Sequence, residues 1–544
     1  MFGKTGTIKS PPAADRAPQE TERSCTYRML RKVLTENGWV EGIPAADPRI
    51  TAFKGIPFAA PPVGDLRWRA PQPVKNWEGV RKAYTFAPIS MQETPGAGDP
   101  EALYNKEWHV DPEIPMGEDC LYLNVWTPAK TGKEKLPVLF WIFGGGLQCG
   151  YPAEMEFDGE RIARRGVILV SVNYRVNVFG FFAHPELTAA AGDEPCANFG
   201  LLDQRAGMEW VKRNIAAFGG DPENITIFGQ SAGGGSTTAH VTSPMDEGLF
   251  QKAVIQSGGG FCPGFNQDYN SLEQQEKIGE GFLQYLGVSS IEEARKIDAK
   301  TLYEKAVEYP VPIKNGRPSL KWNMVIDGRF LKEDPVSAIL HKRRWPVPLM
   351  MGNTLDEFPA VPPFSSLEDV KTYAQAEFGE DAGEYLSLCD FASGDLEHIR
   401  RKATYNAFEL GNLLWAEKNA GLGKLPIYLY RFNPEMPGDS SGSFHSSELW
   451  FVFETLAKCW RPFRGKHYDL ARQMCNYWTN FAKTGDPNGP DDDGSPMPHW
   501  EPYTESSPRA MYFGDAPAMD EEGYSDLMRF LLKEGLKKLD YRKE

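Results

Sequence analysis

The sequence predicts an α/β fold whose large, mostly parallel central sheet is covered by helices on both faces. Short runs of β-branched and other apolar residues recur along the chain, and segments with helical periodicity separate them. That alternation is typical of parallel strands connected by helices. Apolar residues make up 41% of the 544 residues and charged residues 24%, so the chain can bury a large core.

Five strands and two helices can be placed from these patterns. The clearest buried strands are LPVLFWIF and VILVSV, and NITIF follows the turn Gly219–Pro222. Helices are expected where apolar side chains repeat at helical spacing, at Leu202–Ala217 and Asp526–Leu539. The five expected strands are Leu136–Phe143, Val167–Val172, Asn224–Phe228, Val347–Met351 and Leu425–Phe432.

One large domain is expected over residues 25–544, after a flexible N-terminal arm at residues 1–24 that is polar and rich in Pro and Ala. No long linker interrupts the domain. Residues from about 261 to 342 are more helical and charged, which indicates a helical insertion or lid.

Charge and cysteine usage exclude several classes of protein. The net charge of −15 argues against nucleic acid or an anionic membrane as a partner. No apolar run approaches the ~18 residues of a membrane span. The N-terminus has no apolar signal segment, so we expect a cytoplasmic location. The eight cysteines are spread singly, a spacing that fits neither a zinc site nor a disulfide scaffold.

The pattern G-x-S-x-G occurs twice, and only one copy has the context of a nucleophile elbow. Ser440 lies in PEMPGDSSGSF, a loop composition with no strand leading into it. Ser231 lies in GQSAG, directly after the β-rich NITIF and before small residues. A nucleophile elbow is a tight turn from strand to helix, which needs such glycines. We therefore predict Ser231 as a nucleophile.

Backbone donors for a developing negative charge are expected at two places. The strand that ends at Phe143 continues into Gly144–Gly146, where the backbone can curl with its N–H groups facing one point. A further N–H should come from Ala232, directly after the serine. Each such donor contributes about 3–4 kcal/mol to stabilising the transition state.

A serine nucleophile needs a histidine to accept its proton and a carboxylate to orient that histidine. Both should follow the serine, the acid before the histidine. Among the downstream histidines, His445 precedes an apolar run and suits a loop at a sheet edge, whereas we expect His398 and His467 to be solvated. Asp356 and Glu357 both follow an expected strand, and the residues alone do not choose between them.

From about Val33 to about Tyr512 the sequence resembles the type-B carboxylesterase family, which includes cholinesterases and bacterial esterases. The blocks that carry the resemblance occur in the family's order: KGIPFAAPP at Lys54–Pro62, EDCLYLNVWTP at Glu118–Pro128, NYRVNVFG at Asn173–Gly180, GLLDQRA at Gly200–Ala206, AFGGDPENITIFGQSAGG at Ala217–Gly234 and WTNFAKTGDPN at Trp478–Asn488. Together they are far more specific than one G-x-S-x-G.

The resemblance implies an α/β-hydrolase fold with helical insertions around an active-site gorge, and it implies a role for each candidate. The acid is the glutamate of a DE pair, which falls on Glu357, and the histidine falls on His445. Ser257 matches a serine near that histidine. The oxyanion donors fall on Gly145, Gly146 and Ala232. Two further pairs match structural ion pairs, Arg67 with Glu118 and Arg175 with Asp203.

The sequence also departs from the family pattern. Cys120 matches a cysteine that secreted members pair with an earlier one, but Ser90 stands where that partner would be, so this disulfide cannot form. Gln230 stands where cholinesterases have glutamate, so it gives no support for a cationic choline substrate. The remaining departures bear on pocket shape: Phe143 and Leu147 on either side of the triglycine, and Phe358, which replaces a glycine after the acid.

We therefore expect a serine hydrolase that cleaves small-molecule carboxylic esters through an acyl-enzyme intermediate. One alternative is a non-catalytic, cholinesterase-like binding protein. Another is an esterase specialised for lipid or hydroxycinnamoyl esters, or an amidase. No metal or organic cofactor is implied, since the histidines are scattered and no H-x-x-H or P-loop pattern accompanies them. Acyl and alcohol specificity and oligomeric state are left open.

Overall fold

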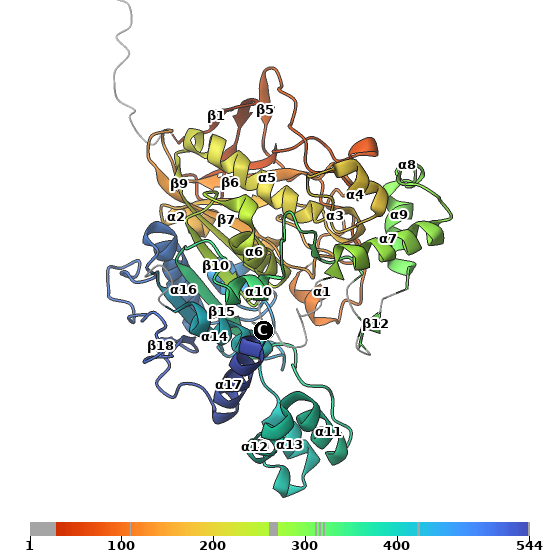
Figure 1. Ribbon diagram of the computed structural model, residues 1–544. Coiled ribbons are helices and arrows are strands. Elements are labelled where there is room, and N and C mark those ends of the chain that lie inside the picture. Colours follow the sequence, from red (N-terminus) through yellow and green to blue (C-terminus); the bar gives the residue numbers. More distant parts are fainter. Residues whose placement is uncertain are drawn as a thin grey trace, which may run out of the picture.

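A large mixed sheet forms the centre of the protein (Figure 1). The computed structural model describes residues 29–108, 110–259, 270–310, 313–314, 317–318, 321–420 and 425–541. Within these residues, eleven strands pair in the spatial order β18 (Pro517–Met519), β17 (Met511–Phe513), β16 (Ile427–Phe432), β15 (Leu349–Thr354), β10 (Lys252–Gln256), β9 (Gly220–Gln230), β7 (Leu136–Ile142), β8 (Ile168–Val172), β6 (Tyr122–Thr127), β4 (Thr51–Pro57) and β3 (Ile43–Pro44).

The strands from β17 to β8 are parallel to their neighbours, and the antiparallel pairings lie at the two edges of the sheet. The prediction of a mostly parallel sheet is therefore confirmed, and all five predicted strands are present. Three of them have bounds within two residues of the prediction, and two differ by more. β9 begins at Gly220, inside the predicted turn, and its pairing with β7 is irregular opposite Leu136–Val138. β15 extends to Thr354, three residues beyond its predicted end.

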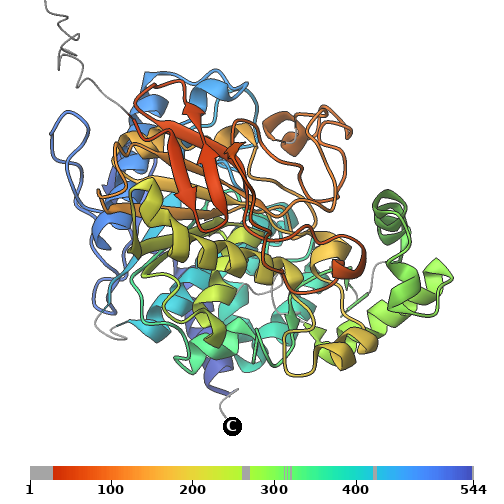
Figure 2. The ribbon, with the colours of Figure 1, turned by 90° about the horizontal axis from the view of Figure 1, so that it is seen from above.

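Helices cover both faces of the sheet (Figure 2). On one face, Phe140 of β7 and Val172 of β8 approach Gly207 of α5. On the other, Trp141 of β7 packs against Phe157 and Phe453. Helices α5 (Phe199–Asn214), α6 (Ala232–Thr242), α10 (Pro335–Leu340) and α14 (Ala407–Asn419) belong to the first layer, and α2 (Glu160–Arg164), α15 (Leu449–Val452) and α16 (Gly465–Thr484) to the second. Short helices α3 (Asn177–Gly180) and α4 (Pro185–Ala191) precede α5.

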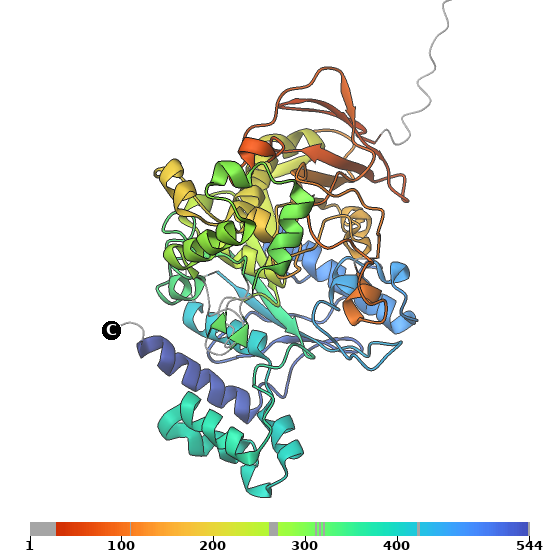
Figure 3. The same cartoon turned by 90° about the vertical axis from the view of Figure 1, so that its right-hand side faces the viewer.

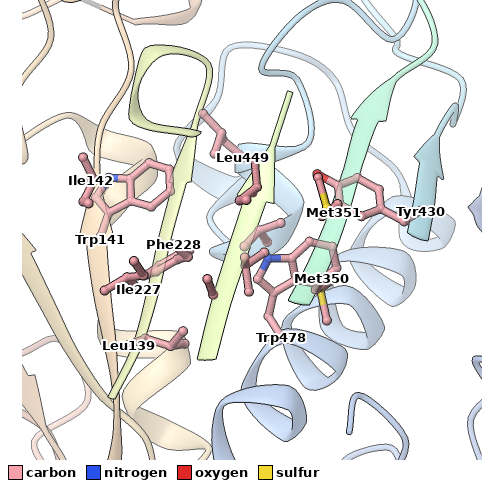
Figure 4. Packing of buried hydrophobic residues seen from close by; sticks show 14 of the residues in the cluster. Leu139, Trp141, Ile142, Ile227, Phe228, Met350, Met351, Tyr430, Leu449 and Trp478 are labelled. Carbon is pink, nitrogen blue, oxygen red and sulfur yellow. The ribbon is translucent and has the colours of Figure 1, made fainter. Parts of the chain in front are cut away.

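The main core lies on both faces of the parallel strands, where they meet the two layers of helices, and Figure 4 shows part of it. Trp141 and Phe228 come from neighbouring strands, and their ring centroids are 4.7 Å apart. Trp478 of α16 contacts Tyr430 of β16, with ring centroids 5.2 Å apart. Fully buried aromatic side chains of this size contribute much of the hydrophobic stabilisation of a domain.

The predicted insertion contains helices α7 (Leu272–Leu286), α8 (Ile291–Ala294) and α9 (Ala299–Glu308), which lie to one side of the sheet (Figure 1). It also contains the short pairs β11 (Asn270–Ser271) with β14 (Val325–Ile326) and β12 (Ile313–Lys314) with β13 (Arg317–Pro318). Helix α10 falls inside the predicted bounds of this insertion but packs against α6 and α14. The predicted arm at residues 1–24 lies outside the described residues.

A second helical lobe, which the sequence analysis did not predict, projects from the sheet (Figures 1 and 3). It consists of α11 (Leu367–Phe378), α12 (Ala382–Leu388) and α13 (Leu396–Ala403). Phe378 of this lobe contacts Phe530 of α17 (Asp526–Tyr541), with ring centroids 5.2 Å apart. The lobe therefore rests on the C-terminal helix, whose predicted position is confirmed.

Two smaller features complete the fold. Strands β1 (Lys32–Thr35), β2 (Gly38–Glu41) and β5 (Val80–Lys82) form a separate three-stranded sheet, and α1 (Leu103–Glu107) lies before β6.

Among the described residues, none of the helices combines the length and the apolar character that crossing a bilayer requires.

Both predicted structural ion pairs are present. Arg67 Nε lies 2.6 Å from Glu118 Oε1, and Arg175 Nη2 lies 2.7 Å from Asp203 Oδ1. Asp203 is fully buried and accepts three hydrogen bonds from Arg175, through the backbone N–H, Nε and Nη2. The second pair therefore joins the end of the loop after β8 to α5.

Replacing Asp203 with alanine should destabilise the protein by about 3–5 kcal/mol, because it leaves the Arg175 guanidinium buried without its partner. The guanidinium-chloride denaturation midpoint measures this. Glu273→Ala, in the exposed pair with Lys277, is the matched control and should change the midpoint little. An unchanged midpoint in Asp203→Ala would contradict the structural role of the pair.

Candidate active site

Ser231 lies on a sharp turn between β9 and α6. Its φ of 56° and ψ of −125° are rare for a residue with a side chain. Two backbone hydrogen bonds hold the turn: the Ser231 N–H donates to Gln256 O at 2.9 Å, and the Gly235 N–H donates to Ser231 O at 2.8 Å. The strained conformation is that of a nucleophile elbow, in which the hydroxyl projects beyond the end of the strand.

The glycines on either side of Ser231 are required by close packing. A Cβ atom on Gly229 would lie 2.3 Å from the Gly233 carbonyl oxygen, and one on Gly233 would lie 2.1 Å from the Ile142 carbonyl oxygen. No larger side chain fits at either position without moving the backbone. The serine of the other match lies in a different setting, because Ser440 is exposed in a bend after β16, with no strand leading directly into it.

His445 lies within hydrogen-bonding distance of both Ser231 and Glu357, although the three residues are far apart in the sequence. His445 Nε2 is 2.8 Å from Ser231 Oγ, and His445 Nδ1 is 2.5 Å from Glu357 Oε2. The imidazole and the carboxylate are both buried. The serine hydroxyl, the imidazole and the carboxylate therefore form one continuous chain of contacts.

The second oxygen of Glu357 is held by neighbouring side chains. Oε1 accepts hydrogen bonds from Ser257 Oγ at 2.6 Å and from Thr354 Oγ1 at 2.9 Å. Ser257 therefore contacts the acid and not the histidine directly. Thr354 was not identified from the sequence, because its contact depends on β15 running three residues beyond the expected end. These two hydroxyls fix the carboxylate so that Oε2 faces the imidazole.

Asp356 has a different set of contacts from Glu357, on the loop that leads to His445. Its Oδ2 accepts the Ser443 N–H at 2.7 Å, and its own N–H donates to Ser443 O at 3.1 Å. A Cβ atom on Gly442 would lie 2.2 Å from Asp356 Oδ2. Asp356 therefore anchors the loop that carries His445, while the adjacent carboxylate contacts the imidazole.

The triglycine loop lies against the elbow. Gly145 and Gly146 have φ values of 103° and 62°, which the absence of a side chain makes accessible. A Cβ atom on Gly144 would lie 3.0 Å from Ser231 Cβ, so the loop runs directly beside the serine. In the part of the chain that the structure describes, the N–H groups of Gly145, Gly146 and Ala232 donate to no protein acceptor.

Buried carboxylates govern the protonation of the site. Burial lowers the pKa of the His445 imidazole, but the charge and hydrogen bond of Glu357 outweigh it, and the pKa lies above its usual value. Glu448, which the sequence analysis missed, is fully buried and accepts a hydrogen bond from Gln256 Nε2 at 3.3 Å. Burial, together with the negative charge of Glu357, raises the pKa of Glu448 to about 7.

Residues at which the sequence departs from the family pattern lie around the imidazole or in the core. Gln230 Nε2 is 3.4 Å from His445 Nε2. The Phe358 ring packs against the imidazole, with centroids 4.7 Å apart. In contrast, Phe143 stacks on Tyr174 at 4.2 Å in the core, and Leu147 is also buried. Of these residues, Gln230 and Phe358 are therefore the ones that contact His445.

The other candidate groups have structural partners away from the serine. His398 is partly exposed and pairs with Asp390. The expectation that His467 is solvated is wrong: it is buried at the start of α16, where Nδ1 accepts the Arg464 N–H and Nε2 contacts Glu435 O. Its polar neighbours in the sequence hide this capping role. Across the described ranges, no group of three or more Cys, His, Asp and Glu side chains could hold a metal ion.

The sequence matches the Carboxylesterase family over residues 30–531. It is 32% identical over 503 residues to the fumonisin B1 esterase of Sphingopyxis macrogoltabida, and the aligned region covers 88% of this chain and 86% of that protein. It is 33% identical over 471 residues to the para-nitrobenzyl esterase of Bacillus subtilis (strain 168), and the aligned region covers 84% of this chain and 90% of that protein.

Solved structures agree with these matches. A structure of PNB esterase superimposes with a TM-score of 0.74 at 29% identity, covering 92% of this chain and 99% of that one. A carboxylesterase of Geobacillus stearothermophilus superimposes with a TM-score of 0.69 at 32% identity, covering 92% of this chain and 100% of that one. The chain therefore belongs to the carboxylesterase family and is a serine-type carboxylic-ester hydrolase with the α/β-hydrolase fold.

Proposed function

We propose that Ser231, His445 and Glu357 are the catalytic triad that hydrolyses small-molecule carboxylic esters. The observation that carries the proposal is the unbroken contact chain from Ser231 Oγ through the His445 imidazole to Glu357 Oε2, at 2.8 and 2.5 Å. These are the distances at which a hydroxyl can pass its proton to an imidazole that a carboxylate orients.

In the first half-reaction, Ser231 Oγ attacks the ester carbonyl carbon while His445 Nε2 takes the hydroxyl proton. The carbonyl oxygen becomes an oxyanion that accepts hydrogen bonds from the N–H groups of Gly145, Gly146 and Ala232. His445 then donates the proton to the alcohol oxygen as the carbon–oxygen bond breaks. The alcohol leaves, and the acyl group remains on Ser231.

In the second half-reaction, water attacks the acyl carbon and gives a proton to His445 Nε2. The imidazolium returns that proton to Ser231 Oγ, and the carboxylic acid leaves. Glu357 stabilises the imidazolium in both halves. Ser257 acts on the reaction through Glu357, because its hydroxyl holds the carboxylate at 2.6 Å.

We propose that residues 25–544 work as one catalytic domain, because both helical insertions return to strands of the same sheet. We also propose a cytoplasmic location, which the buried free thiol of Cys120 supports. The relatives carry the names of different esters, among them fumonisin B1, para-nitrobenzyl and acetylcholine esters.

Ser231→Ala should lower kcat for a nitrophenyl ester by about 10⁵–10⁶-fold, because the variant has no nucleophile at the elbow. In the unchanged protein, an organophosphate should label Ser231, and peptide mass mapping locates the adduct. Ser440→Ala is the matched control, since it changes the serine of the other G-x-S-x-G and should be labelled and active. Full activity in Ser231→Ala would overturn the proposed function.

Glu357→Gln should lower kcat by about 10³–10⁴-fold, because the amide neither fixes the imidazole tautomer nor stabilises the imidazolium. Asp356→Asn should keep most of the activity, since an amide oxygen can still accept the Ser443 N–H. Steady-state kinetics on one short-chain ester measures both variants. The reverse order of effects would assign the acid to Asp356.

The value of kcat/KM should rise with pH through the pKa of His445, because only the neutral imidazole can accept the serine proton. Nearby carboxylates hold the proton on His445 to higher pH, so the rising limb of the pH profile of kcat/KM should lie above pH 6.5. Glu448→Gln removes one of these charges and should move the limb to lower pH. A pH profile on an uncharged ester measures the shift, and a shift to higher pH would contradict the electrostatic role of Glu448.

A further inference from the structure

Phe358 is an exposed aromatic side chain beside the imidazole of the proposed triad. It directly follows Glu357, and its ring centroid lies 4.7 Å from that of His445. Its relative exposure is 37%, whereas that of His445 is 6%. A single exposed apolar residue is ordinary on a protein surface. An exposed aromatic ring that packs on the proposed general base can also contact a substrate bound beside that base.

A second aromatic residue provides a comparison at the same site. Phe408 of α14 also packs against the His445 ring, with centroids 5.5 Å apart, but its relative exposure is only 5%. The interior of the protein therefore already covers Phe408. Phe358 is more exposed, and a bound molecule that covers the exposed part of its ring would gain hydrophobic burial.

The chemistry of ester cleavage determines which part of a substrate lies near this ring. The acyl carbon must reach Ser231 Oγ, and its oxygen must face the N–H groups of Gly145, Gly146 and Ala232. The alcohol oxygen must instead receive the proton from His445 Nε2. The alcohol group consequently leaves past His445, the residue against which the Phe358 ring packs.

We infer that Phe358 contacts the alcohol portion of the ester and favours substrates whose alcohol is aromatic. The inference rests on the proposed function of the triad and adds the substrate class. A phenyl ring on the alcohol can pack against the Phe358 ring in an offset or edge-to-face arrangement, whereas a short alkyl group covers less of it. The residue would act on specificity and not on proton transfer.

The test compares two ester series in the wild-type enzyme and in Phe358→Ala. In the alcohol series the acyl group stays acetyl, and kcat/KM is measured for benzyl, butyl and ethyl acetate. In the acyl series the alcohol stays ethanol, with ethyl benzoate compared with ethyl acetate. Phe358→Ala should lower the benzyl-to-ethyl ratio about tenfold, which corresponds to about 1.4 kcal/mol. The benzoate-to-acetate ratio should stay within about twofold.

Three further variants separate specificity from a general loss of structure. Phe358→Tyr keeps the ring and should keep the ratio, and Phe358→Leu keeps apolar volume and should still lower the benzyl-to-butyl ratio several-fold. The leucine variant decides the question if the alanine variant does not fold. Phe408→Leu should lower kcat/KM for all the esters alike, because its ring is covered by the protein itself.

The outcomes distinguish this inference from the proposed function. An unchanged alcohol ratio in both Phe358→Ala and Phe358→Leu would overturn the contact, and a change in the acyl ratio alone would assign Phe358 to the acyl side. Organophosphate labelling of Ser231 in these variants tests the triad independently. If labelling persists while the alcohol ratio is unchanged, only the inference about Phe358 fails.

Discussion

The parallel alignment of four strands is the constraint on which the site depends. Strands β9, β10, β15 and β16 run side by side in one direction, so the residues that follow them meet at the same edge of the sheet. Ser231 follows the first of these strands directly and Ser257 the second. Backbone hydrogen bonds continue the alignment one residue further, from the Ser231 N–H to Gln256 O and from the Ser257 N–H to Gly352 O.

The same alignment explains why two serines with strained backbone conformations lie at the ends of neighbouring strands. Ser231 and Ser257 both have positive φ, at 56° and 44°. Each serine turns sharply at the end of its strand, and a backbone hydrogen bond to the adjacent strand holds that end in place. Conformations of this kind persist only where the surrounding structure determines them, and here the tight packing of Gly229, Gly233 and Gly234 leaves the chain no room to relax.

Electrostatics at the site follows from how deeply the acids are buried. Glu357 is satisfied on both sides, by two hydroxyls at one oxygen and by the imidazole at the other. Glu448 has a weaker set of contacts, and its raised pKa reflects burial beside that charge. The pKa of His445 therefore depends on more than its direct partner. Asp356 has the same chemistry as Glu357 but acts on the loop instead, which shows that position relative to the imidazole separates the two roles.

The sequence by itself determined the parallel α/β architecture, the elbow at Ser231 and the triglycine loop, because these depend on short-range patterns: buried apolar runs, helical spacing and glycines at fixed offsets. It left Asp356 and Glu357 equal, and resemblance to a family was needed to choose. The α11–α13 lobe was missed although a capping box at Ser366 and Asp369 and apolar spacing at Val370, Ala374 and Phe378 offered a signal.

Only the tertiary structure decided that Thr354 and Ser257 hold the acid, that Glu448 is buried and that Phe358 is exposed against His445. Those facts depend on contacts between segments far apart in the chain, and no local pattern encodes which side chains a distant strand or helix will cover.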